Sequence, residues 1–196
     1  MLIGLTGGMG CGKSTALQAF ARIGWQTLDC DRIGATLLAE DQSLQQRIAA
    51  RFGTEILDEK TGIDKERLAH KVFADQQALA WLEDTLQPHI HQQWKNAVAR
   101  EPQANWVIEV PLLFEKNLAA LFHYTVCVSV SKKTQLARLA SRAMDPTQRA
   151  VRIAHQWPLR QKAIHADFIL FNNGNRSALY AQIEVLVHKL NPTSVS

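Results

Sequence analysis

A run of glycines followed by lysine and serine near the N-terminus has the residue types and spacing of a phosphate-binding loop. Gly7, Gly12, Lys13 and Ser14 occupy the four fixed places of the pattern G-x-x-x-x-G-K-[ST]. Glycines let the backbone curl until successive N–H groups point inward and form a concave anion site. A helix that begins near Lys13 adds its unpaired N–H groups and the positive end of its dipole. The loop therefore predicts binding of a nucleoside triphosphate.

Two residues of this loop have distinct chemical roles. Lys13 can bridge the β- and γ-phosphates, and the Ser14 hydroxyl can ligate the Mg²⁺ that accompanies them. The apolar run 2–6 before the loop predicts a buried strand, and Leu17 and Phe20 after it recur at helical spacing. A strand, a glycine loop and a helix in this order form the context that distinguishes a functional loop from a chance match.

Two aspartates follow the second predicted strand and are expected beside the loop. Asp31 can accept a proton from a substrate hydroxyl as that hydroxyl attacks the γ-phosphate, whereas Asp29 can hold a metal-bound water. Asp31 also precedes the helical run 33–35, and aspartate is a favoured helix cap. The sequence leaves the catalytic base and the helix cap equally open as roles for Asp31.

A basic segment later in the chain offers further cations. Arg138 and Arg142 lie four residues apart on one helix face, and Arg149 and Arg152 follow them. Phosphoryl transfer spreads negative charge over the phosphate oxygens, which closing arginines stabilise while they exclude water. We expect a lid that carries Arg142 and Arg149 over the phosphate loop; a solvated basic face is the alternative.

Cys11 is unusual within such a loop. Its thiol lies near the predicted N-terminus of a helix, where the pKa of a cysteine is lowered. We therefore expect a reactive thiol whose oxidation or alkylation blocks nucleotide binding.

The elements that position these residues alternate between strands and helices. Five short runs rich in apolar or β-branched residues predict strands, at 2–6, 25–29, 106–110, 124–130 and 168–171. This alternation predicts an α/β fold with a five-stranded parallel sheet flanked by helices. Ligands of such sheets bind at the carboxyl ends of the strands, where the phosphate loop, Asp29–Asp31, Pro111–Glu115 and Asn172–Gly174 should meet.

The connection between the second and third predicted strands is exceptionally long. Residues 36–103 are almost wholly helical in pattern, apart from loops at Gly53 and Thr61-Gly62. They far exceed the roughly 12 residues that a crossover requires, which indicates an inserted helical subdomain. Pro88 lies within the longest helical pattern, so we expect a kink or a break there.

Composition limits the remaining possibilities. The chain of 196 residues suits one domain with a sizeable insertion, and its +4 charge is scattered, which supports nucleic-acid binding only weakly. No apolar run approaches the about 20 residues of a membrane span, and the N-terminus lacks signal-peptide features. Cys11, Cys30 and Cys127 show no paired spacing, which is typical of a reducing cytosol. We expect a cytoplasmic monomer or weak homo-oligomer that binds neither nucleic acid nor membrane.

Taken in order, these motifs resemble those of the dephospho-coenzyme A kinases, a family of P-loop proteins similar to nucleoside-monophosphate kinases. The resemblance covers most of the chain. It includes Leu5–Thr15, Asp29-Cys30-Asp31, Phe52-Gly53, Val110–Glu115, Arg152–Ala154 and Asn172 with Gly174. The phosphate loop alone is shared with many families, but its combination with Asp-x-Asp and Val-Pro-Leu-Leu-Phe-Glu is far more specific.

The resemblance implies ATP-dependent phosphorylation of the ribose 3′-hydroxyl of dephospho-coenzyme A, the last step of coenzyme A synthesis. It implies a core at 1–35 and 104–196, a substrate-binding insert at about 36–103 and a lid at about 142–165. The implied catalytic residues are Lys13, Asp31 and Arg142, with Ser14 as the metal ligand. The residues expected to contact ATP are Gly10, Cys11, Gly12, Lys13, Ser14, Thr15, Arg149 and Asn172, the last near the adenine.

Two other classes of protein stay open. Another small-molecule P-loop kinase would share the core but need a differently shaped substrate subdomain. A non-catalytic ATP-binding regulatory module would keep the loop without using Asp31. The absence of an Asn-Lys-x-Asp motif counts against a GTP-dependent switch.

Overall fold

A parallel sheet forms the centre of the computed structural model, which describes residues 1–58, 60–73, 75–141 and 146–190. Its strands are β1 (Leu2–Gly7), β2 (Gln26–Asp29), β5 (Trp106–Glu109), β6 (Tyr124–Ser129) and β7 (Phe168–Phe171). They lie in the order β2-β5-β1-β6-β7, and every neighbouring pair is parallel. The predicted five-stranded parallel sheet is therefore confirmed, with all its carboxyl ends at one edge.

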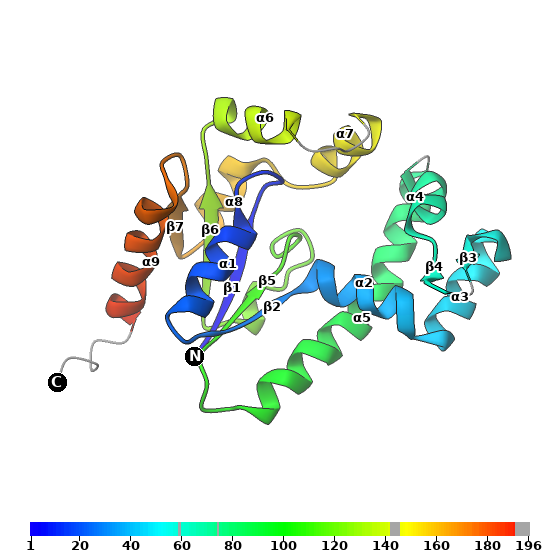
Figure 1. Ribbon diagram of the computed structural model, residues 1–196, viewed down its shortest axis with the longest axis horizontal. Helices are drawn as coiled ribbons and strands as arrows, with labels where there is room; N and C mark the ends of the chain where they lie inside the picture. The colour runs from blue at the N-terminus through cyan, green and yellow to red at the C-terminus, as the bar shows by residue number, and fades with distance from the viewer. Residues whose placement is uncertain (59, 74, 142–145, 191–196) are drawn as a thin grey trace.

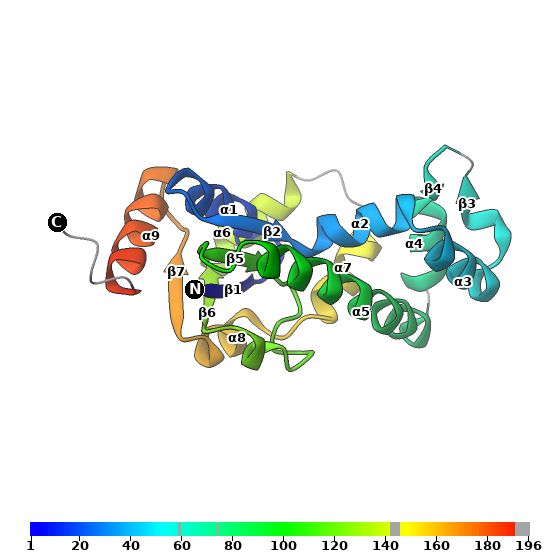
Figure 2. The ribbon, with the colours of Figure 1, turned by 90° about the horizontal axis from the view of Figure 1, so that it is seen from below.

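Helices cover both faces of this sheet. Successive side chains of a strand point to opposite faces, and here the side chains on both faces are apolar. Val107 of β5 packs with α1 (Lys13–Arg22) and α9 (Arg176–Leu190) on one face. Its neighbours Trp106 and Ile108 pack on the other face, where α8 (Leu159–His165) and the carboxyl-terminal half of α5 (Gln76–Arg100) lie. Figures 1 and 2 show the sheet between these two layers. Burial on both faces is the property that makes a parallel sheet stable.

Helices that extend away from the sheet can be followed in Figure 1. Their apolar side chains form a second core. These helices are α2 (Cys30–Glu40), α3 (Gln42–Phe52), α4 (Lys65–Phe73) and α5. We call residues 30–100 the helical extension. Its core is centred on Leu44, Ile48 and Ile56, all of them fully buried or nearly so. The remaining helices, α6 (Lys132–Ala140) and α7 (Pro146–Ala154), follow β6.

The helical extension excludes one expected feature and adds another that was not expected. Pro88 does not break α5, which continues as one helix of 25 residues, so of the two expected outcomes only a kink stays a prediction. Leu79 and Leu82 pack into the second core before the proline, and Trp94 packs against the sheet after it, so tertiary contacts hold both halves. The chain also forms a short hairpin, β3 (Leu57–Asp58) with β4 (Gly62–Ile63), where only loops were expected.

The turn of this hairpin explains why it forms. Asp58 Oδ1 accepts hydrogen bonds from the Lys60 and Thr61 backbone N–H groups and from the Thr61 hydroxyl. Gly62 adopts a φ of 72°, which favours glycine. Ile63 is then buried in the second core.

Among the described residues, no helix combines the length and the apolarity that crossing a membrane requires.

Two phenylalanines that differ in burial give a direct test of this packing. Phe20 on α1 is fully buried, whereas Phe171 on the edge strand β7 is 57% exposed. Phe20→Ala should lower the free energy of unfolding by about 3 to 5 kcal/mol because it leaves a cavity. Phe171→Ala, the matched control, should change it by less than about 1 kcal/mol. Chemical denaturation measures both, and equal losses would contradict the assigned core.

Candidate active site

The phosphate loop connects β1 to α1 at the carboxyl edge of the sheet. Gly10 and Gly12 adopt φ values of 82° and 89°, in the left-handed region that other residues rarely enter. Gly12 is the residue before α1, so Lys13, Ser14 and Thr15 form the first turn of that helix. Ser14 is exposed and Thr15 half-buried, whereas Gly10 is buried. The geometry presents the unpaired N–H groups of a helix N-terminus beside the loop.

The loop is held from behind by side chains that bind its carbonyl groups. Asn172 Nδ2 donates a hydrogen bond to the Cys11 carbonyl oxygen at 2.9 Å, and Arg138 Nη1 reaches the same oxygen at 3.5 Å. Gln135 Nε2 donates to the Met9 carbonyl oxygen at 2.8 Å. Because the C=O and N–H of a trans peptide point in opposite directions, each anchored carbonyl turns the following N–H group the other way. The anchors therefore support a cradle of N–H groups.

Asn172 has a structural task that the sequence did not reveal. It is buried, with 5% of its surface exposed, and its own carbonyl oxygen accepts a hydrogen bond from Arg138 Nη2 at 2.9 Å. The Asn172 side chain thus lies against the loop backbone; its contact with an adenine ring stays a prediction. Arg138 joins it there, although the sequence suggested only a basic helix face for this arginine.

Lys13 forms a buried ion pair that sequence reasoning missed. Its Nζ lies 3.6 Å from Glu109 Oε1 and 3.4 Å from the Gly8 carbonyl oxygen. Only 11% of the Lys13 side chain and 7% of the Glu109 side chain are exposed. Burial raises the pKa of Glu109 to about 7, with Asp29 and Asp31 adding to the rise and Lys13 opposing it. An acidic residue within the apolar strand 106–110 was the available signal.

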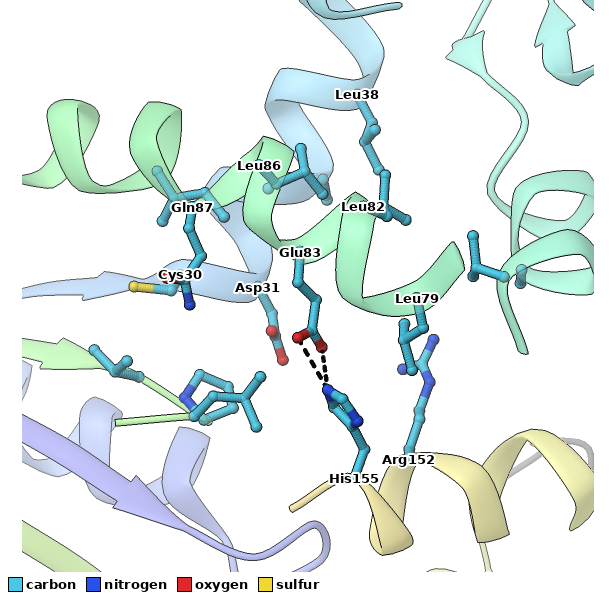
Figure 3. Close-up of a pocket in the computed structure, with 18 of the residues that line it drawn as sticks. Cys30, Asp31, Leu38, Leu79, Leu82, Glu83, Leu86, Gln87, Arg152 and His155 are labelled. Carbon is cyan, nitrogen blue, oxygen red and sulfur yellow. Dashed lines mark hydrogen bonds and ion pairs between the residues drawn. The ribbon is translucent and has the colours of Figure 1, made fainter. Parts of the chain in front are cut away.

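Asp29 and Asp31 have different roles, and the interpretation of Asp31 as a helix cap is wrong. Asp29 caps α2, because its Oδ1 accepts hydrogen bonds from Asp31 N at 2.8 Å and Arg32 N at 3.2 Å. Asp31 stands in the first turn of the helix with its carboxylate directed into a cavity (Figure 3). Surrounding protein raises the pKa of Asp31, as does Asp29, while Lys13 and Arg152 lower it. Asp31 nevertheless keeps access to solvent.

A cavity of about 430 Å³ extends from Asp31 between the helical extension and the sheet. Most of its wall is apolar and comes from α2, α4, α5 and the segment after β5. Its apolar lining includes Leu38, Leu68, Val72, Leu79, Leu82, Leu86, Ile90, Val110, Pro111 and Leu112. Met9 of the phosphate loop also lines it. The cavity and the loop therefore meet at Asp31.

Polar residues from α5, from α7 and from the residue that follows α7 line one side of this cavity. His155 Nε2 lies 2.9 Å from both carboxylate oxygens of Glu83, and Figure 3 shows this pair facing Asp31. Lys116 Nζ lies 3.4 Å from Glu83 Oε2. The Arg152 guanidinium stacks over the Phe73 ring of α4 at 5.0 Å. These contacts join α7 to the helical extension.

The segment after β5 is fixed by Lys162, a residue that the sequence analysis did not single out. Lys162 of α8 is fully buried, and its Nζ hydrogen-bonds the Pro111 carbonyl oxygen and lies 2.8 Å from Glu115 Oε1. Glu115 Oε1 also accepts a hydrogen bond from Trp157 N at 2.7 Å. This network holds the wall of the cavity beside the sheet.

Of the two arginines expected in the lid, the structure describes Arg149 and not Arg142. Arg149 lies on α7 and is half-buried. Arg142 lies outside the described residues, so its predicted place over the loop stays a prediction.

The expectation of a reactive Cys11 thiol is contradicted. Cys11 is fully buried, and burial raises the pKa of its thiol; Lys13 and a Gly8 hydrogen bond oppose this rise only in part. The argument from a nearby helix N-terminus omitted the protein that covers the sulfur.

The parallel sheet and the phosphate loop, with a cavity beside the loop, are the features of a P-loop small-molecule kinase. Solved structures share this fold: TT1252 from Thermus thermophilus, with a TM-score of 0.80 and 26% identity, covers 97% of both chains. A dephospho-CoA kinase from Campylobacter jejuni has a TM-score of 0.71 at 21% identity and covers 99% of this chain and 98% of its own. A shikimate kinase from Bacteroides thetaiotaomicron, with a TM-score of 0.54 at 18% identity, shares the fold alone.

Sequence comparison narrows the class to one family. The family model for dephospho-CoA kinase matches residues 1–178. A dephospho-CoA kinase from Gloeobacter violaceus is 35% identical over 93% of this chain and 89% of its own length. One from Shewanella oneidensis is 34% identical over 94% and 91%. The chain belongs to the dephospho-CoA kinase family, which confirms the family and the kinase class predicted from the sequence.

The corrected environment of Cys11 predicts a protected thiol. Iodoacetamide at pH 8 should alkylate Cys11 in the native protein at least about tenfold more slowly than in the guanidinium-unfolded chain, because burial keeps the thiolate scarce and covered. Mass spectrometry of the Cys11 peptide measures the rate. Equal rates in both states would contradict the buried position.

Proposed function

We propose that this kinase transfers the γ-phosphoryl group of ATP to the ribose 3′-hydroxyl of dephospho-coenzyme A, giving coenzyme A and ADP. Family membership supports the reaction. The observation that carries the assignment of the site is that one largely apolar cavity is lined both by Met9 of the phosphate loop and by Asp31. A phosphoryl donor and an extended acceptor can therefore meet there.

The loop residues bind the nucleotide in this proposal. Backbone N–H groups from Gly10 to Thr15 hold the phosphates, and Lys13 neutralises the charge that develops on the transferring group. The exposed Ser14 hydroxyl, in the first turn of α1, suits the Mg²⁺ that accompanies ATP, since Mg²⁺ is usually held by few protein oxygens plus phosphates. When bound, Mg²⁺ neutralises phosphate charge.

The helical extension binds the acceptor. The cavity of about 430 Å³ has a largely apolar wall, which suits the long pantetheine arm of dephospho-coenzyme A. Its ribose would then lie at the mouth, beside Asp31. We assign the core to residues 1–35 and 104–196 and the substrate-binding insert to about 36–103, as expected from the sequence.

Asp31 acts as the general base. It takes the proton of the 3′-hydroxyl while the hydroxyl oxygen forms a bond to the γ-phosphorus, and the bond from that phosphorus to the β–γ bridging oxygen breaks. The leaving group is ADP. The opposing influences on the pKa of Asp31, burial above all against Lys13 and Arg152, suit a base that must be ionised before it accepts a proton.

Residues of about 142–165 form the lid. Arg142 and Arg149 would stabilise phosphate charge and exclude water when the lid closes. The contacts of His155 with Glu83 and of Arg152 with Phe73 support this assignment, because they attach α7 to the wall of the acceptor cavity. The buried, unpaired cysteines 11, 30 and 127 suit a cytoplasmic enzyme.

Release of ADP with a panel of acceptors tests the proposed reaction. With ATP and Mg²⁺, dephospho-coenzyme A should support turnover, whereas AMP, shikimate and gluconate should support little, because only the first fills the apolar cavity. A coupled assay measures each rate. Preferred turnover of another acceptor would contradict the proposal, and ATP binding without turnover of any acceptor would indicate a regulatory module.

The role of Asp31 predicts a selective loss of the chemical step. Asp31→Asn should lower kcat by about 10²- to 10⁴-fold, the usual contribution of a positioned base, with ATP affinity nearly intact. Asp84→Asn is the matched control, because Asp84 is 70% exposed and should leave kcat unchanged. Steady-state kinetics and ATP titration measure the two effects. Near-normal turnover of Asp31→Asn would remove the carboxylate from catalysis.

A further inference from the structure

In the buried ion pair between Lys13 and Glu109, the Glu109 carboxylate holds the same ammonium group that the phosphates of a bound nucleotide would contact. Glu109 and the nucleotide therefore compete for Lys13. Lys13 is the first residue of α1, and Glu109 is the last residue of β5. Strand β5 lies beside β1, the strand that leads into the phosphate loop. Both side chains are nearly covered by protein, so their interaction is weakly screened. The second carboxylate oxygen of Glu109, Oε2, is buried without a hydrogen-bond partner. Lys13 is thus the cation that the described residues place directly against this carboxylate.

The charges around Glu109 are otherwise negative or neutral. Asp29 of β2 pairs with Glu109 in the sheet register, and Asp31 of α2 also acts on it. The Cys30 thiol faces the same group, and burial with these carboxylates keeps it protonated by raising its pKa. Arg152 of α7 acts on Asp31. Weakening the contact with Lys13 would leave Glu109 as an uncompensated buried charge, which is costly.

A bound nucleotide weakens that contact. The β- and γ-phosphates attract the Lys13 ammonium towards the loop, and in the absence of Mg²⁺ they also bring further negative charge close to Glu109. Both changes favour the neutral carboxylic acid over the carboxylate.

We propose that Glu109 holds Lys13 in the nucleotide-free enzyme and takes up a proton from solvent when a nucleotide engages Lys13. The proton adds to a carboxylate oxygen of Glu109, no covalent bond to the nucleotide forms, and release of the nucleotide returns the proton. Glu109 is therefore a positioning residue that couples nucleotide affinity to pH. This inference depends on the proposed binding of ATP at the loop.

The position of Glu109 on the pH scale supports this coupling. Its pKa of about 7 with Lys13 beside it means that the carboxyl is largely ionised at pH 7.5 before the nucleotide arrives. A further rise of its pKa in the complex then requires net proton uptake near neutral pH. A group whose pKa rises on binding strengthens binding at low pH, and this contribution is lost as the pH rises through the pKa of the complex.

Calorimetric titration of the full chain with ATP in EDTA tests the proposal. Titrations at pH 7.5 in buffers of different ionisation enthalpy give the number of protons bound with the nucleotide. For each ATP bound, the wild-type protein should take up roughly half a proton or more in addition to the number taken up by the Glu109→Gln variant. Protons that ATP itself gains or loses contribute equally to both titrations and cancel in this difference. From pH 7 to 8.5, ATP affinity should fall more steeply for the wild type than for this variant.

Two further variants separate the proposal from a loss of structure. Glu115→Gln removes a carboxylate from another buried Glu–Lys pair, in which Glu115 pairs with Lys162 and not with Lys13, and should keep the wild-type proton number. Lys13→Met should lose the uptake, because Glu109 is then already protonated before ATP binds. Equal proton numbers for wild type and Glu109→Gln would overturn the inference while ATP binding stands. Absence of ATP binding to the wild type would overturn the proposed function and this inference together.

Discussion

The outward anchoring of the phosphate-loop carbonyls is the interaction on which the rest of the site depends. A loop can cradle phosphates only when its N–H groups face the ligand, and free carbonyl groups there would repel the same anion. Asn172 and Arg138 bind the Cys11 carbonyl, and Gln135 binds that of Met9. These anchors come from the end of β7 and from α6, so elements late in the chain shape a loop at its beginning.

The parallel sheet makes this long-range arrangement possible. Because all five strands run in one direction, the residues that follow β1, β2, β5 and β7 meet at one edge. Helix α5 then connects this edge to the cavity proposed to bind the acceptor, since it packs with the second core through Leu79 and Leu82 and with the sheet through Trp94. One continuous helix thereby sets the distance between the two halves of the proposed reaction.

Local patterns predicted most of the fold and the position of the phosphate loop within it. The phosphate loop is one short segment with fixed spacing, and the strands are apolar runs separated by helical patterns, so both could be recognised without tertiary information. The hairpin at 57–63 escaped prediction because its strands have only two residues each. At Pro88 the sequence left a kink and a break open, and the packing of α5 on both sides of the residue accounts for the absence of the break.

The missed contacts join residues far apart in the chain. Lys13 meets Glu109, Glu83 meets His155, and Lys162 meets Glu115, and no local spacing rule predicts such pairs. The same limit explains the wrong expectation for Cys11, whose thiol was judged from its neighbours in sequence while its burial comes from the folded sheet. The helix-cap role considered for Asp31 is excluded because Asp29, two residues earlier, already caps α2.

We propose that the phosphoryl donor and the acceptor hydroxyl meet at Asp31. A crystal structure with a non-hydrolysable ATP analogue, Mg²⁺ and dephospho-coenzyme A measures this directly. The account predicts the ribose 3′-oxygen within about 2.6 to 3.2 Å of the Asp31 carboxylate, the γ-phosphorus in line with it, and the pantetheine arm in the cavity lined by α2, α4 and α5. A ribose bound away from Asp31, or a pantetheine arm outside that cavity, would contradict the account.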